Sequence, residues 1–195
     1  MERLHHFGLR DRWIYEVLVS TFRDGAPHAA PIGLWCEGAD ELFMDLYDGS
    51  QTLTNILESG ALVANFPADV ALLFAALRAP DQLAFTAARR VCAPLVVGCP
   101  AAVELTVSSV CPNGDKVRIA TTVECLHADA AAHLINRAEG LLLESLILAT
   151  RLEHMETSVV VAAIKENHRV VGRVAPGSDH ERMLAALLGD LRPAS

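Results

Sequence analysis

The stretch that decides the predicted fold is DLYDGSQTLTNILESGALVANF, residues 45–66. Its Asp48-Gly49 pair is typical of a turn, because glycine accepts a positive φ and aspartate can bond its own backbone. Either Ser50 or Thr52 can then cap a helix with its side-chain oxygen. We therefore predict a strand that ends at residue 47, a hydroxyl-rich turn and a short helix.

Apolar residues spaced three and four apart, at positions 53, 56 and 57, give this helix one buried face. Gly60 ends the helix, and residues 61–66 are apolar enough for a buried strand. A polar turn that leads into a helix N-terminus directs several backbone N–H groups and hydroxyls to one point, as in many phosphate sites. Two interpretations stay open here: an anion site, or an ordinary capped helix that binds nothing.

The chain has 195 residues, is 52% apolar and carries a net charge of −8. This length suits one domain, or one domain with a small helical appendage, and the apolar content allows a substantial core. The negative charge disfavours binding to nucleic acid or to an anionic membrane surface, and favours a small-molecule or protein partner. We expect a cytoplasmic protein, since the sequence has no run long enough for a transmembrane helix and no signal peptide.

The five cysteines are odd in number and show no Cys-x-x-Cys spacing, and the eight histidines also lack metal spacing. These patterns predict neither a disulfide framework nor a metal site. We expect most of the cysteines to be buried as small hydrophobic residues. A redox pair of Cys92 and Cys99 is the alternative.

Alternating and β-branched patterns predict a series of antiparallel strands in the first two thirds of the chain. The predicted strands cover residues 13–21, 28–36, 41–47, 61–66, 101–110 and 116–126, with a helix over 69–77. Pro31 cannot donate to a ladder, so the second strand needs an edge or a bulge at that position. About six strands with few helices between them predict a small antiparallel barrel.

The last third of the chain is rich in helix-forming residues. The predicted elements are one long helix over 129–155, a shorter one over 156–169 and a terminal amphipathic helix over 179–191. Arg137, Glu144 and Arg151 are seven residues apart, so they share one stripe of the long helix, and Gly140 lies on the same stripe. That stripe either faces solvent or lines a cleft in which an arginine meets an anion.

The chain has no nucleophile elbow, Walker loop or dinucleotide fingerprint, and no pair of carboxylates stands out as an acid/base couple. Four motifs, in order and spacing, resemble an uncharacterised family of FMN-binding split-barrel proteins, flavin-reductase-like in type, from methanogens and methylotrophs. They are the strand at 28–33, the turn and helix at 49–56, Asn136-Arg137-Ala138 and Thr150-Arg151-Leu152. The resemblance covers roughly residues 13–190.

The resemblance implies an α+β fold, mainly antiparallel β, in which a split β-barrel of the FMN-binding type carries a long C-terminal helix and a small helical appendage. We accordingly divide the chain into a split-barrel core over 1–127 and a helical portion over 128–195, packed on the barrel as a single structural unit. The resemblance also implies a homodimer with FMN at the subunit interface. Because the cofactor performs the hydride chemistry, no side chain needs to be an acid or a base.

The resemblance also assigns cofactor-binding residues along the flavin. The phosphate and ribityl chain would contact Ser50, Gln51, Thr52 and Asn55, and Arg151 would supply a cation. The isoalloxazine ring would lie along His28, Ala29, Ala30, Pro31 and Ile32, and Asn65 would reach the flavin or its surroundings. Small residues in this strand fit the close approach of a flat ring to the backbone.

The sequence departs from the family pattern at the phosphate turn, where Asp48 and Gln51 stand in place of a basic residue. His28 also replaces the usual small amide. An aspartate near a phosphate dianion is unfavourable unless it points away or pairs with an arginine. The resemblance implies an FMN-dependent oxidoreductase or flavin-reductase-like protein, associated with tetrahydromethanopterin and one-carbon metabolism. The alternative is a non-enzymatic binding module that holds another phosphate-bearing ligand.

Overall fold

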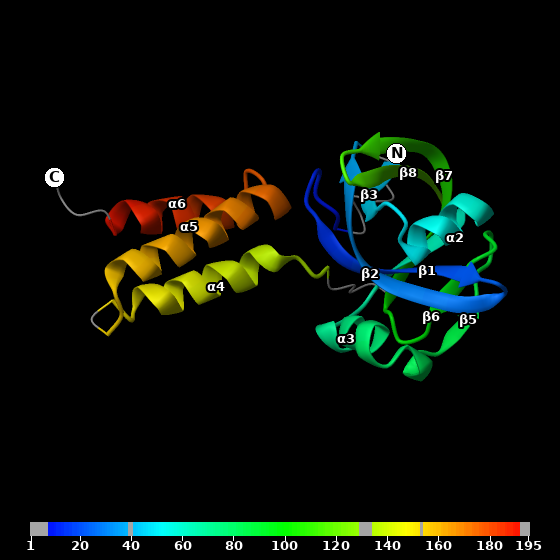
Figure 1. The fold of residues 1–195 in the computed structure, drawn as a ribbon, viewed down its shortest axis with the longest axis horizontal. Coiled ribbons are helices and arrows are strands. Elements are labelled where there is room, and N and C mark those ends of the chain that lie inside the picture. Colours follow the sequence, from blue (N-terminus) through cyan, green and yellow to red (C-terminus); the bar gives the residue numbers. More distant parts are fainter. Residues whose placement is uncertain (1–7, 39–40, 129–133, 153, 192–195) are drawn as a thin grey trace. The chain divides into compact units, whose positions relative to one another are not determined.

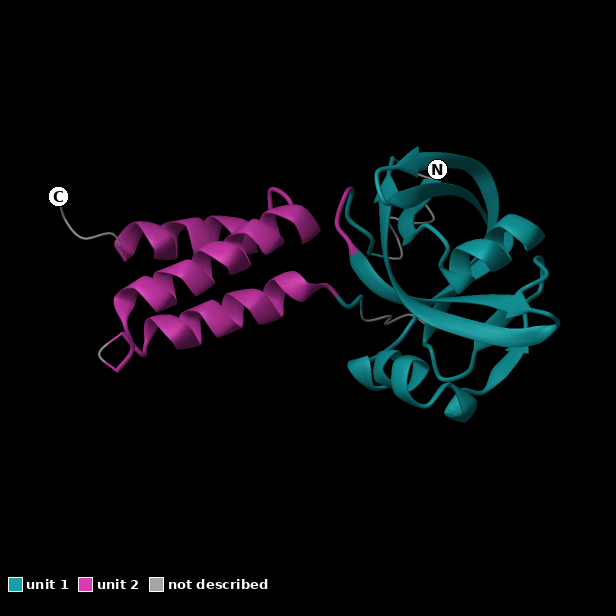
Figure 2. Ribbon diagram, in the orientation of Figure 1, with its two compact units in different colours: residues 1–11, 15–135 teal, residues 12–14, 136–195 magenta. Residues whose placement is uncertain are grey.

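The computed structural model describes residues 8–38, 41–128, 134–152 and 154–191. The chain forms two compact units, residues 1–11 with 15–135 and residues 12–14 with 136–195 (Figure 2). The first unit contains all the strands and the second is helical. The predicted boundary after residue 127 falls near the end of the last strand, and the packing of the helical portion on the barrel stays a prediction.

Six antiparallel strands close the barrel in the order β1-β2-β3-β8-β7-β4 (Figure 1). They are β1 Tyr15–Arg23, β2 Ala26–Glu37, β3 Glu41–Tyr47, β4 Ala61–Phe66, β7 Ala101–Asn113 and β8 Lys116–Ala128. The predicted fold class, a mainly antiparallel split barrel, is confirmed. The first strand starts two residues later than predicted, because Trp13 and Ile14 pack against the core of the helical unit instead.

The barrel interior is filled by alternate side chains of its strands. Val19 pairs with Ala64 and Ala64 with Val103, so these three side chains share the inner face, and all three are fully buried. Val17 and Ile119 are buried as completely. An interior packed in this way leaves ligands only the outer face, the strand edges and the ends of the barrel.

The strand β2 has one open edge. Residues 26–34 pair with β1, but β3 pairs only with Leu34–Glu37. Within the described residues, the second edge of residues 26–33 therefore has no strand partner. Pro31 lies in this stretch, which confirms the edge predicted for it. An open edge presents backbone N–H and C=O groups to whatever lies beside it.

The predicted helix after β3 is confirmed as α2, Gln51–Ser59. The Oγ atom of Ser50 accepts a hydrogen bond from the N–H of Leu53 at 3.4 Å, as its cap. Gly60 ends the helix in the left-handed region, with a φ of 65° that favours glycine. Both ends are therefore fixed by the residues that the sequence pattern singles out.

An outer layer built from residues 70–96 covers part of the barrel. It contains α3 Val70–Arg78, the short η1 Pro80–Gln82 and a two-stranded sheet of β5 Phe85–Ala87 and β6 Pro94–Val96. Leu18 and Ala29 on the barrel pack with Ala76 and Val96 of this layer. The helix was predicted at 69–77, but the small sheet was not.

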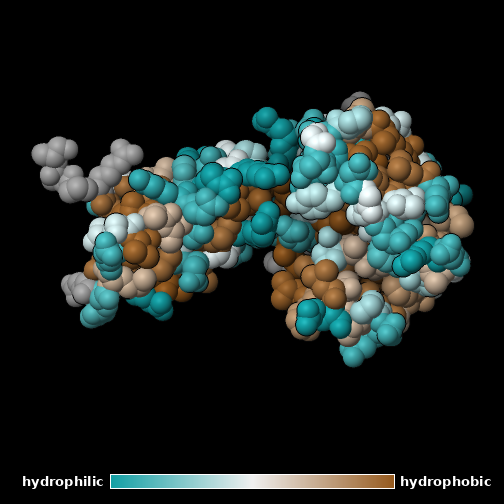
Figure 3. Space-filling model, in the orientation of Figure 1, coloured by the Kyte–Doolittle hydropathy of each residue, from teal (hydrophilic) through white to brown (hydrophobic). Residues whose placement is uncertain are grey.

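The outward face of α3 is apolar. Val70, Phe74 and Leu77 lie at helical spacing and remain 65%, 67% and 68% exposed. Figure 3 shows apolar surface gathered over this helix. Exposed apolar faces of this kind are often covered by a partner.

The helical unit contains α4 Arg137–Ala149, α5 Thr157–Val174 and α6 Asp179–Asp190. The prediction of one helix over 129–155 is wrong, although residues 129–133 lie outside the described part. Asn136 caps α4 by accepting from the N–H of Ala138 at 2.8 Å, and residues 150–152 form a turn. The longest helix is α5, which extends through residues 170–174 beyond the predicted end at 169. No helix in the described part of the chain is long and apolar enough to cross a membrane.

Candidate functional site

The N-terminus of α2 presents open hydrogen-bond donors. The N–H of Thr54 donates to the carbonyl of Ser50, as the helix requires. Among the described residues, none accepts a hydrogen bond from the N–H of Gln51 or Thr52. Gly49, with a φ of 72°, makes the turn that brings the chain into this helix. Two backbone donors and the Ser50 hydroxyl thus meet at one end of α2.

Side chains tie this helix to the ends of β1 and β2. The Nε2 atom of His28 lies 3.1 Å from Oγ1 of Thr52. Asn55 donates from Nδ2 to Oγ1 of Thr21 at 2.9 Å, and its Oδ1 accepts from Nε2 of Gln51 at 2.7 Å. Thr21 and His28 face each other across the β1–β2 ladder. The structure thus brings together four of the predicted residues, His28, Gln51, Thr52 and Asn55, beside the cap Ser50.

Two cationic residues that sequence reasoning missed, Arg23 and Lys116, lie in the barrel unit. Burial lowers the pKa of His28, and the charge of Arg23 lowers it further, so the ring is neutral at pH 7. Arg23 ends β1 and lies 4.0 Å from the carboxylate of Asp24. Lys116 is opposite Tyr47 in the β3–β8 ladder, and its ammonium lies 4.4 Å from the centre of that ring. Neither residue was assigned to the site, because the strand register places them near the turn.

The predicted ring-binding strand, residues 28–32, divides between two faces. His28, Ala30 and Ile32 share the face of Thr21, Val19 and Val17, their ladder partners. Ala29 and Pro31 share the opposite face, where Ala29 packs under the outer layer. Adjacent residues of a strand point to opposite faces, so these five residues cannot all line one face of a flat ligand. A ring beside this strand would therefore lie along its open edge.

Two other predicted residues stand apart from this cluster. Asn65 is fully buried, and its side-chain amide bonds to groups on β1, β4 and β6. Arg151 is exposed and belongs to the helical unit, so its relation to Ser50 stays a prediction. Arg137, Gly140 and Glu144 are exposed on α4, whereas Arg151 lies beyond its end. The four residues therefore do not form one stripe of a single helix.

A second polar cluster, missed by sequence reasoning, surrounds the buried carboxylate of Glu104 on β7. Its Oε1 accepts from the N–H of Arg89 at 2.7 Å and lies 2.6 Å from Nε2 of His127. Its Oε2 accepts from the N–H groups of Arg90 and Val91 at 2.6 Å and 3.0 Å. Burial alone would raise the pKa of Glu104, but these hydrogen bonds outweigh it and hold the pKa below its ordinary value.

The same carboxylate also belongs to a possible metal-ligating group. Ligand atoms of Glu104, Cys125 and His127 lie within 4.8 Å of one another. A carboxylate offers about four lone-pair positions, and the contacts above occupy all four of Glu104. A metal ion would have to displace one of these short contacts, so the group fits a structural network better than a metal site.

The cysteines are less buried than predicted. Only Cys36 is fully buried, whereas Cys92 and Cys111 are exposed. The five cysteines, all of them described, form no disulfide, and so the proposed pair of Cys92 and Cys99 is not linked here. Burial raises the pKa of the Cys99 thiol to about 12. Cys99 is therefore a neutral thiol at physiological pH.

The family models divide the chain as the structure does. Residues 15–132 match the model described as "Protein of unknown function (DUF447) N-terminal domain", and residues 136–188 match "Protein of unknown function (DUF447)". The chain belongs to the DUF447 family. The gap between the two models contains the boundary between the two compact units at residues 135 and 136.

Solved structures support this assignment at the level of the fold. An FMN-bound DUF447 protein from Methanosarcina mazei is 21% identical, with a TM-score of 0.57, over 97% of this chain and 100% of that chain. A flavoredoxin from Methanosarcina acetivorans is 15% identical, with a TM-score of 0.54, over 60% of this chain and 69% of that one. A flavoredoxin from Desulfovibrio vulgaris (Miyazaki F) is 21% identical, with a TM-score of 0.52, over 60% and 70%. The predicted family resemblance is confirmed, and this DUF447 chain has the flavin-reductase-like split-barrel fold.

Proposed function

We propose that this DUF447 protein binds FMN, with the phosphate at the N-terminus of α2 and the ring along the open edge of β2. The observation that carries the proposal is the 3.1 Å contact between His28 and Thr52, which joins that edge to the helix N-terminus. Support also comes from the FMN-bound relative of the same family, which matches over 97% of this chain. An elongated ligand with an anionic end and a flat end suits this juxtaposition.

The donors at α2 fit a phosphate group. The N–H groups of Gln51 and Thr52 and the hydroxyl of Ser50 would hold its oxygens, since a helix N-terminus favours an anion. Arg23 is the cation of the barrel unit that we assign to this site, because its charge already acts on His28. Asp48 is exposed at the turn, so its carboxylate can point into water. In this proposal Arg23 supplies the basic residue that the phosphate turn lacks in the sequence.

The open edge of β2 suits the flavin ring. Residues 28–33 are small or only partly exposed, and their backbone groups on that edge have no strand partner in the described chain. Bound FMN would supply hydride or electron transfer, while the protein binds, orients and shields it. We propose an oxidoreductase or flavin-reductase-like activity on this basis, with Thr52 and His28 as positioning residues. The link to tetrahydromethanopterin metabolism stays a prediction from the family resemblance.

A homodimer that shares the flavin between subunits also remains part of the proposal. The exposed apolar face of α3, residues 70, 74 and 77, offers surface that a second copy could cover. The alternative function, a binding module for another phosphate-bearing ligand, uses the same donors at α2. These two functions differ in whether the open edge of β2 receives a flavin ring.

The pair of substitutions Ser50→Ala and Thr52→Val is expected to weaken FMN binding by about 100-fold, because it removes two hydroxyl groups from the phosphate site. The measurement is quenching of flavin fluorescence when the full-length protein is titrated into FMN. Thr54→Ala is the matched control, because its hydroxyl is exposed and bonds back to the carbonyl of Ser50. Unchanged affinity in the double variant would show that the phosphate lies elsewhere. Binding of riboflavin as tight as that of FMN would show that no phosphate site exists.

The affinity for FMN is expected to rise as the pH falls from about 8 to about 6.5. Without ligand, burial and Arg23 lower the pKa of His28 and keep its ring neutral. A phosphate dianion beside the imidazole of His28 would raise the pKa of that residue, so FMN binding would take up a proton. Isothermal titration in buffers of different ionisation enthalpy measures this uptake. His28→Gln should abolish it; an uptake that persists in this variant would place the proton on another group.

A further inference from the structure

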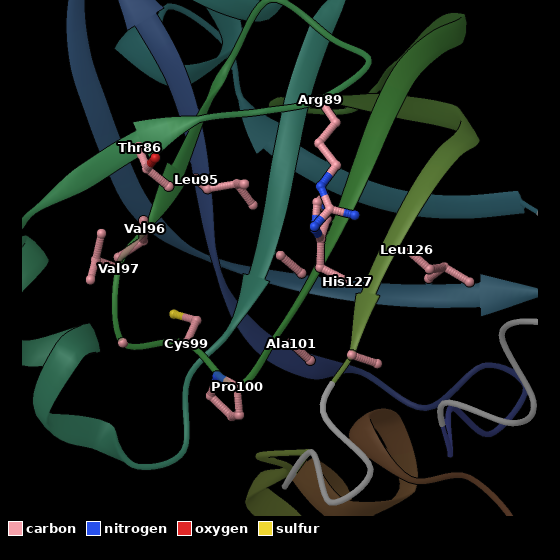
Figure 4. Close-up of a pocket in the computed structure, with 13 residues that line it drawn as sticks. Thr86, Arg89, Leu95, Val96, Val97, Cys99, Pro100, Ala101, Leu126 and His127 are labelled. Carbon is pink, nitrogen blue, oxygen red and sulfur yellow. The ribbon is translucent and has the colours of Figure 1, made fainter.

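A pocket lies in the barrel unit beside β6, whose residue Val96 packs with Ala29 and donates to Asn65. Its volume is about 480 Å³, within the range of small-molecule sites. Its walls come from β6 and the following loop, from the start of β7 and from the end of β8 (Figure 4). It therefore opens between the outer face of the barrel and the layer that covers it.

The pocket combines apolar walls with a few polar groups. Leu95, Val97, Pro100 and Leu126 supply apolar side chains around it. The polar side chains come from Arg89, Thr86 and His127, and Figure 4 shows the Arg89 side chain extending across the pocket toward His127. Cys99 adds a thiol that stays neutral, so it brings no negative charge. Few convergent polar groups on apolar walls are typical of a ligand site.

The buried carboxylate of Glu104 holds Arg89 and His127 of this pocket in place. It fixes the backbone of Arg89 through the 2.7 Å hydrogen bond to its N–H. It also lies 2.6 Å from Nε2 of His127. Because the pKa of Glu104 is held below its ordinary value, the carboxylate is ionised and can only accept, so that nitrogen carries the proton. The polar side of the pocket is thus prearranged rather than a chance meeting of surface side chains.

We propose that this pocket binds a small organic monocarboxylate with an apolar, ring-sized body. The guanidinium of Arg89 matches a carboxylate through two parallel N–H···O bonds. Arg89 brings a single guanidinium to the pocket, which suits a monoanion better than a phosphate dianion. The apolar walls would cover the rest of the ligand.

The test uses benzoate as the probe and the full-length, 15N-labelled protein without added flavin, so its outcome does not depend on FMN binding. Saturable shifts are expected for the amides of residues 97–99, 101 and 126–128, which line the pocket. Arg89→Gln should weaken binding at least about tenfold. Arg89→Lys should weaken it less, because lysine keeps the positive charge but lacks the two parallel N–H donors of the guanidinium. Benzamide, which is neutral and of similar shape, should bind at least about tenfold more weakly than benzoate.

Arg90→Gln is the matched control. The backbone N–H of Arg90 also donates to Glu104, but its side chain is exposed and does not line the pocket. Its affinity for benzoate should stay within about twofold of the unmodified protein, which confirms that the Arg89 side chain acts locally. Equal losses in the two variants would overturn the proposal. So would equal binding of benzamide, shifts that lie elsewhere, no saturable shift, or inorganic phosphate shifting the same amides as strongly.

Discussion

Replacing Glu104 with glutamine is expected to lower the free energy of unfolding of the barrel unit by about 3 kcal/mol. The carboxylate is fully buried and accepts from three backbone N–H groups besides its contact with His127. A glutamine of the same size turns one acceptor oxygen into an NH₂ group. Two donors would then face each other without water, and a buried donor that loses its partner carries the full cost of desolvation.

The effect can be measured by urea unfolding followed through tryptophan fluorescence. Trp35 lies in the barrel unit and Trp13 in the helical unit, so a Trp13→Phe background leaves Trp35 as the reporter of the barrel. Glu124→Gln is the matched control, because that glutamate is exposed on the neighbouring strand and, among the described residues, accepts from Thr106 alone. It should change the free energy of unfolding by less than about 0.5 kcal/mol. Similar losses in both variants would contradict the structural role of Glu104.

The parts of the fold that the sequence predicts correctly are those set by neighbours along the chain. The turn at Asp48-Gly49, the cap at Ser50 and the stop at Gly60 are local signals, and α2 has the bounds that they imply. Pro31 likewise identifies an open edge without any knowledge of the sheet. Each of these signals depends on the conformation of one or two residues.

The errors in the helical unit arise because its helix boundaries were predicted from composition and not from capping residues. Asn136 stands before an apolar run and is a strong candidate for a cap, so its type could have shown that α4 begins after it. The end of α5 was missed because Val170 and Val171 lower helix propensity. Burial of Val171 and Val174 in the helical core outweighs that preference.

The polar clusters could not be predicted in the same way, because their members are distant in the sequence. His28 and Thr52 are joined only through the register of β1 with β2 and the return of the chain through α2. Glu104 meets His127 through the register of β7 with β8, and it meets Arg89 through the layer that covers the barrel. No motif spacing records such contacts, and a glutamate in a strand normally indicates an exposed position.

Replacing Asn65 with alanine is expected to lower the free energy of unfolding of the barrel unit by about 3 kcal/mol. The Nδ2 atom of Asn65 donates to the carbonyl of Leu18 and to Oγ of Ser20, at 2.9 Å and 2.8 Å. Its Oδ1 accepts from the N–H of Val96 at 2.9 Å. Alanine would leave that buried N–H without an acceptor and loosen the attachment of β6 to the barrel.

The same variant separates two roles for Asn65, because stability without FMN and affinity for FMN can be measured independently. A structural residue lowers the urea midpoint of the flavin-free protein, whereas a flavin contact lowers affinity in protein that remains folded. Asn113→Ala is the matched control, since that amide is exposed and donates only to Asp45 at 3.1 Å. The buried, fully bonded amide of Asn65 argues for the structural role. Unchanged stability together with weaker FMN binding would instead support the flavin contact that the family resemblance implies.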